Sequence, residues 1–180
     1  MPSSIKARPH LFSRFTALYI YRAATVLNFH YTSTIDAPVS IVWAFYERPD
    51  ILQLIAPPWQ PVDVIRREGG LGVGAETEFT IHLGPLPLRW LARHTECTPN
   101  QLFIDEQIDG PLDHWIHRHE FVGENGKTRL TDSITYALPG GEFSEAAIGW
   151  FVNDRLRDMF RYRHAVTQRE CQRLAKVQEG

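Results

Sequence analysis

The chain has 180 residues, enough for one domain with a short extension but too few for two full-sized domains. Hydrophobic residues make up 43% of the sequence and charged residues 22%, a globular mixture that excludes wholesale disorder. With 19 basic and 21 acidic residues the net charge is -2, so no basic excess indicates a nucleic-acid partner. No apolar stretch approaches the roughly 20 residues that span a bilayer. Two cysteines are too few for a disulfide framework and favour a reduced, cytoplasmic setting.

Residues 1–24 differ in composition from the rest of the chain. They contain basic residues, prolines and hydroxyl residues, but no acidic residue. A targeting segment has this composition, and so does a loosely attached extension. We therefore divide the chain into a basic N-terminal extension, residues 1–24, and a domain, residues 25–180. The extension is expected to contribute little to the core.

The predicted elements begin with a half-buried strand, because apolar and polar residues alternate from Leu27 to Ile35. Asp36 is expected to cap a helix that has Pro38 in its first turn. The apolar stripe of this helix continues to Tyr46. A second short helix is expected from Asp50 to Ile55.

Six more strands are predicted, divided by short turns that contain Gly, Pro or Asn. Their expected ranges are Pro61–Arg67, Ala75–Leu83, Leu88–Thr98, Leu102–Asp109, Leu112–Val122 and Lys127–Leu138. No connection is long enough for a crossover helix, so the sheet should be antiparallel. Helical spacing of apolar residues then predicts one long helix from about Ser144 to Ala175. The fold class is therefore α+β, a curved seven-stranded antiparallel sheet covered by a long C-terminal helix.

Several local sequences follow one another in an order that resembles a known superfamily. They are Ile35-Asp-Ala-Pro38 with Val42-Trp43, Leu54–Trp59, Phe103–Gln107, Gly110-Pro111, Trp115–Phe121, Thr131-Asp132 with Tyr136–Gly140, and Phe160–His164. Over residues 27–175 the chain resembles the SRPBCC superfamily, the helix-grip fold of START domains, polyketide cyclases and the birch pollen allergen. The resemblance is greatest to its ligand-binding SRPBCC domain group. It implies a cavity for a hydrophobic or amphipathic small molecule, but neither a particular reaction nor a catalytic residue.

The turn positions predict a register for the central strands. If Gly110-Pro111 is a two-residue turn, Ile104 lies opposite His117. If Gly123–Gly126 is the next loop, His117 lies opposite Asp132. Facing residues share a face of the sheet, so these polar groups are expected on the more apolar face, towards the long helix.

The same reasoning predicts a polar row inside the cavity. Arg93 is expected to pair with Glu106, and His117 with Asp132, because an unpaired buried charge costs several kcal/mol. Such a row is either a structural ion-pair network or a recognition patch. If the protein is an enzyme, His117 or Glu106 is the candidate base, with Arg93 or Tyr136 stabilising an enolate-like oxygen.

The residues expected to contact a ligand come from the inner sheet face and from the long helix. They are Phe79, Ile81, Arg93, Ile104, Glu106, Trp115, His117, His119, Asp132, Ile134, Tyr136, Phe151, Arg155 and Met159. On the long helix, Arg161, Arg163 and Arg169 are interpreted as part of a solvated face.

A metal site is not predicted, although His117 and His119 share a strand face as two metal ligands would. His114 is expected to point to the opposite face. The sequence lacks the helical ligand motif of the Rieske oxygenases and the later histidine motif of the cupins. No cofactor is therefore expected.

Carriage or sensing of a hydrophobic small molecule, such as a lipid, a quinone or a polyketide-like compound, is the leading functional prediction. No G-x-S-x-G elbow or cysteine motif indicates a nucleophile. The first alternative is a cyclase or dehydratase that acts on a similar compound. The second is a protein-interaction module that uses the outer sheet face, and a filled interior would favour it. No nucleic acid or membrane span is expected, and the oligomeric state is left open.

Overall fold

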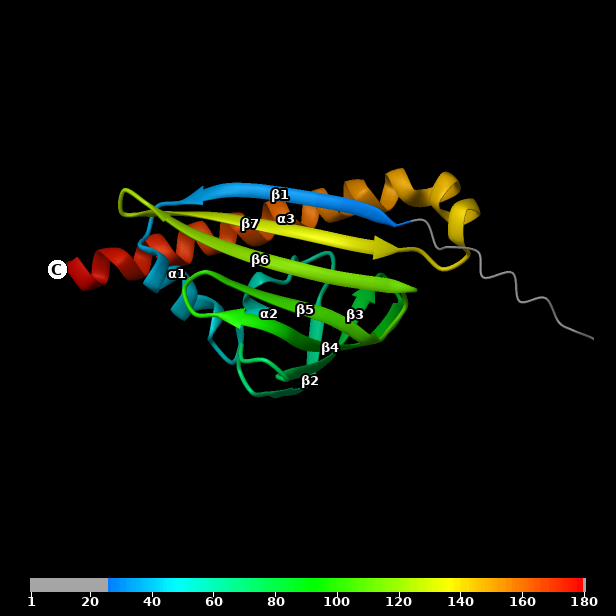
Figure 1. Ribbon diagram of the computed structural model, residues 1–180, viewed down its shortest axis with the longest axis horizontal. Helices are drawn as coiled ribbons and strands as arrows, with labels where there is room; N and C mark the ends of the chain where they lie inside the picture. Colours follow the sequence, from blue (N-terminus) through cyan, green and yellow to red (C-terminus); the bar gives the residue numbers. More distant parts are fainter. Residues whose placement is uncertain (1–25, 180) are drawn as a thin grey trace, which may run out of the picture.

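The structure, a computed structural model, describes residues 26–179, so the predicted extension of residues 1–24 lies outside the described residues. The elements are β1 (Leu27–Ile35), α1 (Val39–Tyr46), α2 (Ile51–Ile55), β2 (Val62–Glu68), β3 (Glu76–Leu83), β4 (Leu86–Thr98), β5 (Leu102–Asp109), β6 (His114–Glu124), β7 (Lys127–Ala137) and α3 (Gly141–Glu179) (Figure 1). The strands form one antiparallel sheet in the order β1-β7-β6-β5-β4-β3-β2. The predicted α+β fold class is confirmed, with element boundaries shifted by a few residues.

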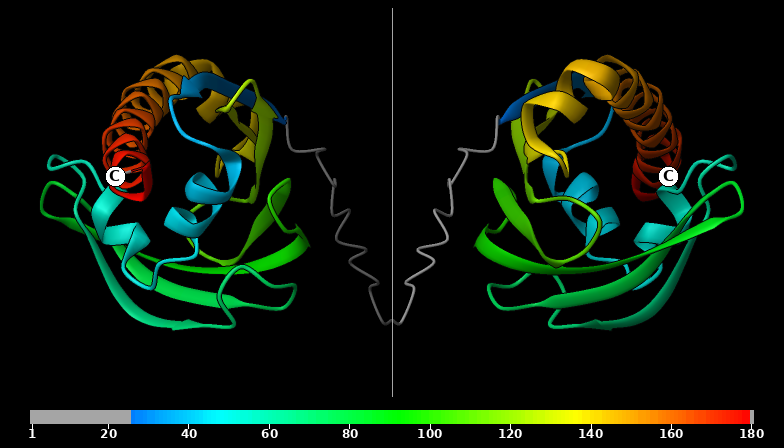
Figure 2. Two further views of the ribbon diagram at one scale, coloured as in Figure 1. Left: turned by 90° about the vertical axis from the view of Figure 1, so that its left-hand side faces the viewer. Right: turned by 90° about the vertical axis from the view of Figure 1, so that its right-hand side faces the viewer.

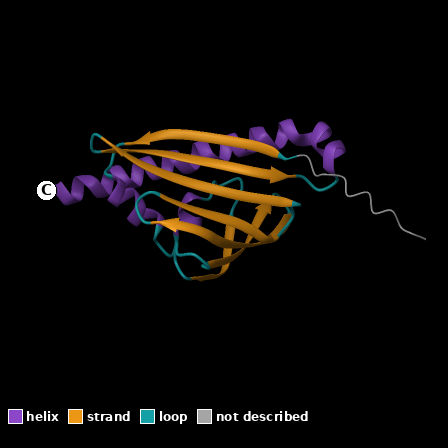
Figure 3. Ribbon diagram, in the orientation of Figure 1, coloured by secondary structure: helices purple, strands orange, loops and turns teal. Residues whose placement is uncertain are grey.

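The sheet is strongly curved, and the helices lie on its concave side. The end-on views in Figure 2 show the strands bending around α1 and α2, with α3 across the open side. The long helix runs alongside β1 and also contacts α1 and α2 (Figure 3). Within residues 26–179, none of the helices is long and apolar enough to cross a membrane.

Two apolar clusters hold the helices against the sheet. In one, Trp43 of α1 meets the rings of Phe103 and Phe121 edge-on. In the other, Phe160 of α3 packs against Phe29 of β1 and neighbouring side chains of β7. Full burial of each large apolar side chain contributes about 1.5–3 kcal/mol, so these clusters fix both ends of the helical layer.

The start of α1 differs from the prediction. Asp36 does not cap the helix, because Pro38 occupies the N-cap position and none of the described side chains makes a capping hydrogen bond. The Asp36 carboxylate instead pairs with Lys127 Nζ at 2.6 Å and accepts a hydrogen bond from Gln168 Nε2 at 2.8 Å. Asp36 therefore ties the connection after β1 to β7 and α3.

The β6–β7 register also differs, because the turn is tighter than predicted. Asn125 and Gly126 form a two-residue turn with φ values of 50° and 78°, the positive values that a type I′ hairpin requires. His119 consequently lies opposite Asp132, and His117 lies opposite Ile134. A shift of two residues keeps every side chain on its predicted face.

The β5–β6 connection is longer than predicted, and this reverses the faces of β5. Residues 110–113 lie between the strands, and Gln107 Nε2 donates a hydrogen bond to the Leu112 carbonyl at 2.7 Å. Asp105, not Ile104, therefore lies opposite His117. Because side chains alternate along a strand, this slip of one residue turns Asp105 inward and its neighbours outward.

Three predicted cavity residues consequently lie on the outer face. Ile104 and Glu106 face outward, opposite Arg118 and Ile116. Arg93 does lie opposite Glu106, as predicted, but the pair is outside the cavity. The Arg93 guanidinium binds the Glu76 carboxylate of β3 at 2.7 Å and is about half exposed.

Candidate functional site

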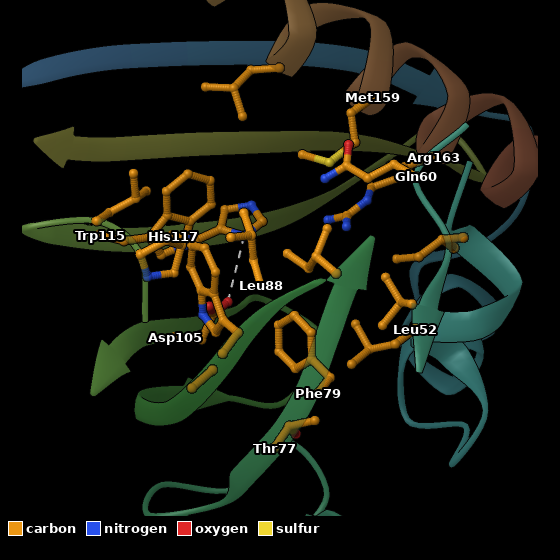
Figure 4. A pocket seen from close by; sticks show the side chains of 18 of the residues that line it. Leu52, Gln60, Thr77, Phe79, Leu88, Asp105, Trp115, His117, Met159 and Arg163 are labelled. Atoms are coloured by element: carbon orange, nitrogen blue, oxygen red, sulfur yellow. Dashed lines mark ion pairs between the residues drawn. The ribbon is translucent and has the colours of Figure 1, made fainter. Parts of the chain in front are cut away.

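A cavity of about 630 Å³ lies between the concave face of the sheet and α3. Its wall is largely apolar and is formed by residues of α2, of the five strands β2 to β6 and of the middle of α3. The apolar lining includes Leu52, Ile55, Phe79, Ile81, Leu88, Trp90, Ala92, Phe103, Leu112, Trp115, Leu156 and Met159. Figure 4 shows Phe79, Leu88, Trp115 and Met159 from opposite sides of this cavity.

Most of the predicted contact residues lie where the sequence placed them. Phe79, Ile81, Trp115, His117, His119, Phe151, Arg155 and Met159 line the cavity. Asp132, Ile134 and Tyr136 are buried on the same face of the sheet but do not belong to the lining. Arg93, Ile104 and Glu106 lie on the outer face, so Glu106 has no access to the cavity and is excluded as its base.

The cavity also contains polar residues that the sequence reasoning missed. Asp105 lines the wall beside His117, and Arg163 reaches in from α3 (Figure 4). The helical spacing could have predicted the position of Arg163, because this residue lies one turn after Met159 and therefore on the same inward face of α3. The interpretation of Arg163 as part of a solvated face was wrong, although Arg161 and Arg169 are exposed.

Asp132 is the centre of a buried histidine network. Its side chain is 2% exposed. Oδ1 accepts a hydrogen bond from His117 Nε2 at 2.8 Å, and Oδ2 accepts one from His164 Nε2 at 2.5 Å. His119 Nδ1 lies 2.6 Å from Oδ1 but is not aligned as a hydrogen bond, so this buried nitrogen has no hydrogen-bond partner within residues 26–179. The predicted contact between His117 and Asp132 is confirmed, although the two are diagonal rather than direct cross-strand neighbours.

Asp105 supplies a second carboxylate on the cavity side of the same two rings. Its Oδ2 accepts a hydrogen bond from His119 Nε2 at 3.2 Å and lies 3.5 Å from His117 Nδ1. The ring centroids of His117 and His119 are 3.7 Å apart. The two imidazoles therefore lie between two carboxylates, Asp132 behind them and Asp105 towards the cavity.

The pKa values of these groups are strongly coupled. Burial raises the pKa of Asp132, but the charge of His119 and the hydrogen bond from His117 outweigh this effect and hold it well below its usual value. Burial lowers the pKa of His119, yet the charge of Asp132 and the hydrogen bond to Asp105 raise it to about 9. Burial and the neighbouring charge of His119 lower the pKa of His117. At neutral pH His119 is therefore protonated on both ring nitrogens, whereas His117 is neutral.

Arg163 places a further cation in the cavity wall. Its guanidinium lies deep in the molecule, and burial lowers its pKa although the charge of Asp132 acts in the opposite direction. Arg163 Nε has no hydrogen-bond partner among the described residues. A donor of this kind suits an anionic or carbonyl oxygen of a molecule in the cavity.

The site therefore combines an apolar chamber with a polar wall that can act in two ways. Arg163 and the histidines can hold the oxygen atoms of an amphipathic molecule whose apolar part fills the rest of the cavity. His117, oriented by Asp132, can also accept or donate a proton. Within the described chain, Asp105, His117 and His119 are also close enough to share a metal ion.

The comparisons with known proteins agree with this architecture. A family model described as "Polyketide cyclase / dehydrase and lipid transport" matches residues 35–164. The chain belongs to this family. The SRPBCC resemblance predicted from the sequence is thereby confirmed. Among curated protein sequences, none matches this chain.

Solved structures with low sequence identity share the fold. The Zhui aromatase/cyclase from Streptomyces sp. R1128 is 14% identical, with a TM-score of 0.67 over 83% of this chain and 95% of that chain. Protein TTHA0849 from Thermus thermophilus is 15% identical, with a TM-score of 0.67 over 83% of this chain and 99% of that chain. A point mutant of norcoclaurine synthase from Thalictrum is 15% identical, with a TM-score of 0.59 over 82% and 98%. At these identities the likeness shows a common fold.

Proposed function

We propose that this domain binds a hydrophobic or amphipathic small molecule, of lipid, quinone or polyketide-like character, in the cavity under α3. The observation that carries the proposal is the cavity of about 630 Å³, apolar over most of its wall and polar at the histidine cluster. Cavities of this size and composition are typical of small-molecule sites. The unfilled interior also argues against the alternative of a protein-interaction module with a solid core.

The arrangement of the polar groups favours carriage or sensing over turnover. His117 is 4% exposed and donates a hydrogen bond to Asp132. Asp132 also accepts a hydrogen bond from His164 and lies in ion-pair contact with His119. A buried network of hydrogen-bonded and ion-paired groups can fix the cavity wall without requiring a reaction. Ligand oxygen atoms are expected at this wall, and the apolar part is expected against Phe79, Trp90 and Trp115.

Native mass spectrometry of the full chain, purified without denaturation, tests this proposal. We expect a co-purifying compound, released by organic solvent, in the wild type. Ala92→Phe should abolish the compound, because Ala92 lines the cavity and the larger ring occupies it. Val122→Phe on the outer face of β6 is the matched control and should retain the compound. A compound retained equally in both variants would place its binding outside the cavity.

The second candidate function is a cyclase or dehydratase, and the His117–Asp132 pair beside the cavity is the observation that favours it. A neutral imidazole oriented by a carboxylate can remove a proton from a bound compound. Product formation from the extracted compound separates this function from carriage. His117→Gln should abolish turnover and Glu106→Gln should not, because Glu106 lies on the outer face. Binding without any conversion supports carriage.

A further inference from the structure

A carboxylate and two imidazoles converge on one point of the cavity wall. One candidate ligand atom from each of Asp105, His117 and His119 lies within 4.8 Å of the other two. His117 Nδ1 and His119 Nε2 lie 3.5 Å and 3.2 Å from the same oxygen, Asp105 Oδ2. In a tetrahedral zinc site with bonds of about 2.0–2.2 Å, neighbouring ligand atoms are separated by about 3.3 Å. Two of the three separations therefore already have nearly the spacing of metal ligands, and the third is at most 4.8 Å.

The hydrogen bond to Asp132 determines which nitrogen of His117 is free. A carboxylate only accepts hydrogen bonds, so His117 Nε2, 2.8 Å from Asp132 Oδ1, carries the ring proton. In the neutral ring Nδ1 then carries a lone pair, and this lone pair faces Asp105 Oδ2. Two acceptors that face each other in a buried site repel, so a cation between them would stabilise the arrangement.

Asp132 is placed to orient both imidazoles from behind. Histidines that bind metals almost always donate their second N–H to a carboxylate, a carbonyl or water. His117 already donates to Asp132, and His119 Nδ1 lies 2.6 Å from the same oxygen. A small rotation of the His119 ring would turn this unaligned contact into a hydrogen bond and satisfy a buried nitrogen that lacks a hydrogen-bond partner in the part of the chain that the structure describes.

Contacts with α3 and β1 fix the position of the Asp132 carboxylate. His164 of α3 donates to its second oxygen at 2.5 Å. Ser33 of β1 lies 2.7 Å from the other ring nitrogen of His164. The carboxylate is thus held between the sheet and the long helix, and the two rings that it contacts are held with it.

We propose that Asp105, His117 and His119 bind one divalent transition-metal ion, with an open coordination position facing the cavity. Two imidazoles and one carboxylate suit zinc and neighbouring first-row ions better than magnesium or calcium, which prefer oxygen ligands. This site goes beyond the proposed function, since an apolar molecule can occupy the cavity without it. The ion would give the cavity a Lewis-acidic contact for an oxygen atom of the ligand.

The charges around the site indicate which ligand would complete it. Asp105 and Asp132 are the carboxylates beside the two imidazoles, and the side chains of Arg67, Arg155 and Arg163 also line the cavity. Metal binding would displace the Nε2 proton of His119 to solvent, and a divalent ion on two neutral imidazoles then leaves this group with an excess of positive charge. A carboxylate or enolate oxygen in the open position would offset the excess, so the ion selects amphipathic ligands that carry an anionic oxygen.

Isothermal titration of the full chain, freed of metal with a chelator, tests the site with Zn²⁺ alone. We expect one saturable site, weakened at least about tenfold by Asp105→Asn and by His119→Gln. His82→Gln is the matched control, because His82 pairs with Asp63 near the surface at 2.7 Å, and it should leave the affinity unchanged. Absence of a saturable site, or a site that Asp105→Asn leaves intact, would overturn the proposal.

Long-range ¹⁵N NMR of the wild-type chain tests the metal site without any variant, and therefore also when a variant fails to fold. Addition of Zn²⁺ should shift the ring nitrogens of His117 and His119 and leave those of His82 unchanged. Shifts confined to His82 or to other exposed rings would contradict the site. No apolar ligand is present in the Zn²⁺ titration, so its result does not depend on the proposed function. Binding of an apolar ligand, measured separately in the presence of a chelator, tests the proposed function without the metal.

Discussion

Asp105 on β5 lies directly opposite His117 on β6, and this pairing determines which face of β5 lines the cavity. It places a carboxylate within 3.5 Å of both imidazoles of the cluster. It also turns Glu106 away from the interior. The chemical character of the cavity wall therefore follows from the four-residue connection between β5 and β6, which sets this register.

Replacement of Asp132 tests how far the buried network supports the fold. Asp132→Ala removes the carboxylate that accepts hydrogen bonds from His117 and His164 and leaves polar groups unpaired in a buried place. Losing one partner of such a pair typically costs about 3–5 kcal/mol. Urea unfolding followed by circular dichroism measures the change in the free energy of unfolding.

Asp63→Ala is the matched control, because Asp63 also pairs with a histidine, His82, but has a side chain that is 75% exposed. It should change the free energy of unfolding by at most about 0.5 kcal/mol. Adding His117→Ala to Asp132→Ala should recover part of the loss, since one orphaned group is then removed. Equal costs for Asp132→Ala and Asp63→Ala would mean that the network does not stabilise the fold.

The thiol of Cys171 should report whether α3 stays in place. Burial raises the pKa of Cys171 to about 12, with a further contribution from the charge of Glu170. Its thiolate is therefore scarce at pH 8, and the side chain is inaccessible. A disulfide reagent at pH 8 should modify Cys171 only when the chain unfolds, and the partly exposed Cys97 should react first. Equally fast modification of both thiols in native buffer would show that α3 opens readily.

Removal of α3 should expose the concave face of the sheet. The helix buries Leu156, Met159 and Phe160 against β1 and β7, so a chain that ends near Gly141 leaves this apolar surface uncovered. Such surfaces promote association. Size-exclusion chromatography with light scattering should detect aggregates or loss of structure. A truncated chain that remained folded and monomeric would contradict the role given to α3.

Local patterns were sufficient to predict the elements of the fold. Strict alternation from Leu27 to Ile35 predicts β1 with the right residues inward, because a strand with one buried face repeats every two residues. Glycine, proline or asparagine occurs in each connection between consecutive strands of the sheet from β2 to β7, because only a few residue types accept the backbone angles of tight turns. These signals are local, and the antiparallel order follows from the short connections between them.

The inner wall of the site was harder to predict, because it depends on loop lengths. Asn125-Gly126 is a strong type I′ signal, and treating it as part of a longer loop shifted the β6–β7 register by two residues without changing faces. Residues 110–113 carry no comparable signal, and the resulting slip of one residue exchanged Asp105 for Ile104 and Glu106. The predicted register placed Asp105 on the outer face, so the cluster of Asp105 with the two histidines was not predicted, and the absence of known metal-binding motifs led to no metal site being expected.

The central claim is that an apolar molecule binds inside the cavity, and the indole N–H signals of the five tryptophans test it most directly. Trp90 and Trp115 meet edge-on in the cavity wall at 5.2 Å, whereas Trp43 lies in the core and Trp150 is exposed. We would titrate the ¹⁵N-labelled full chain with a medium-chain fatty acid below its critical micelle concentration. Saturable shifts of Trp90 and Trp115, with Trp43 and Trp150 unchanged, are the predicted result. Shifts of Trp150 alone, or no saturable shift, would contradict the account.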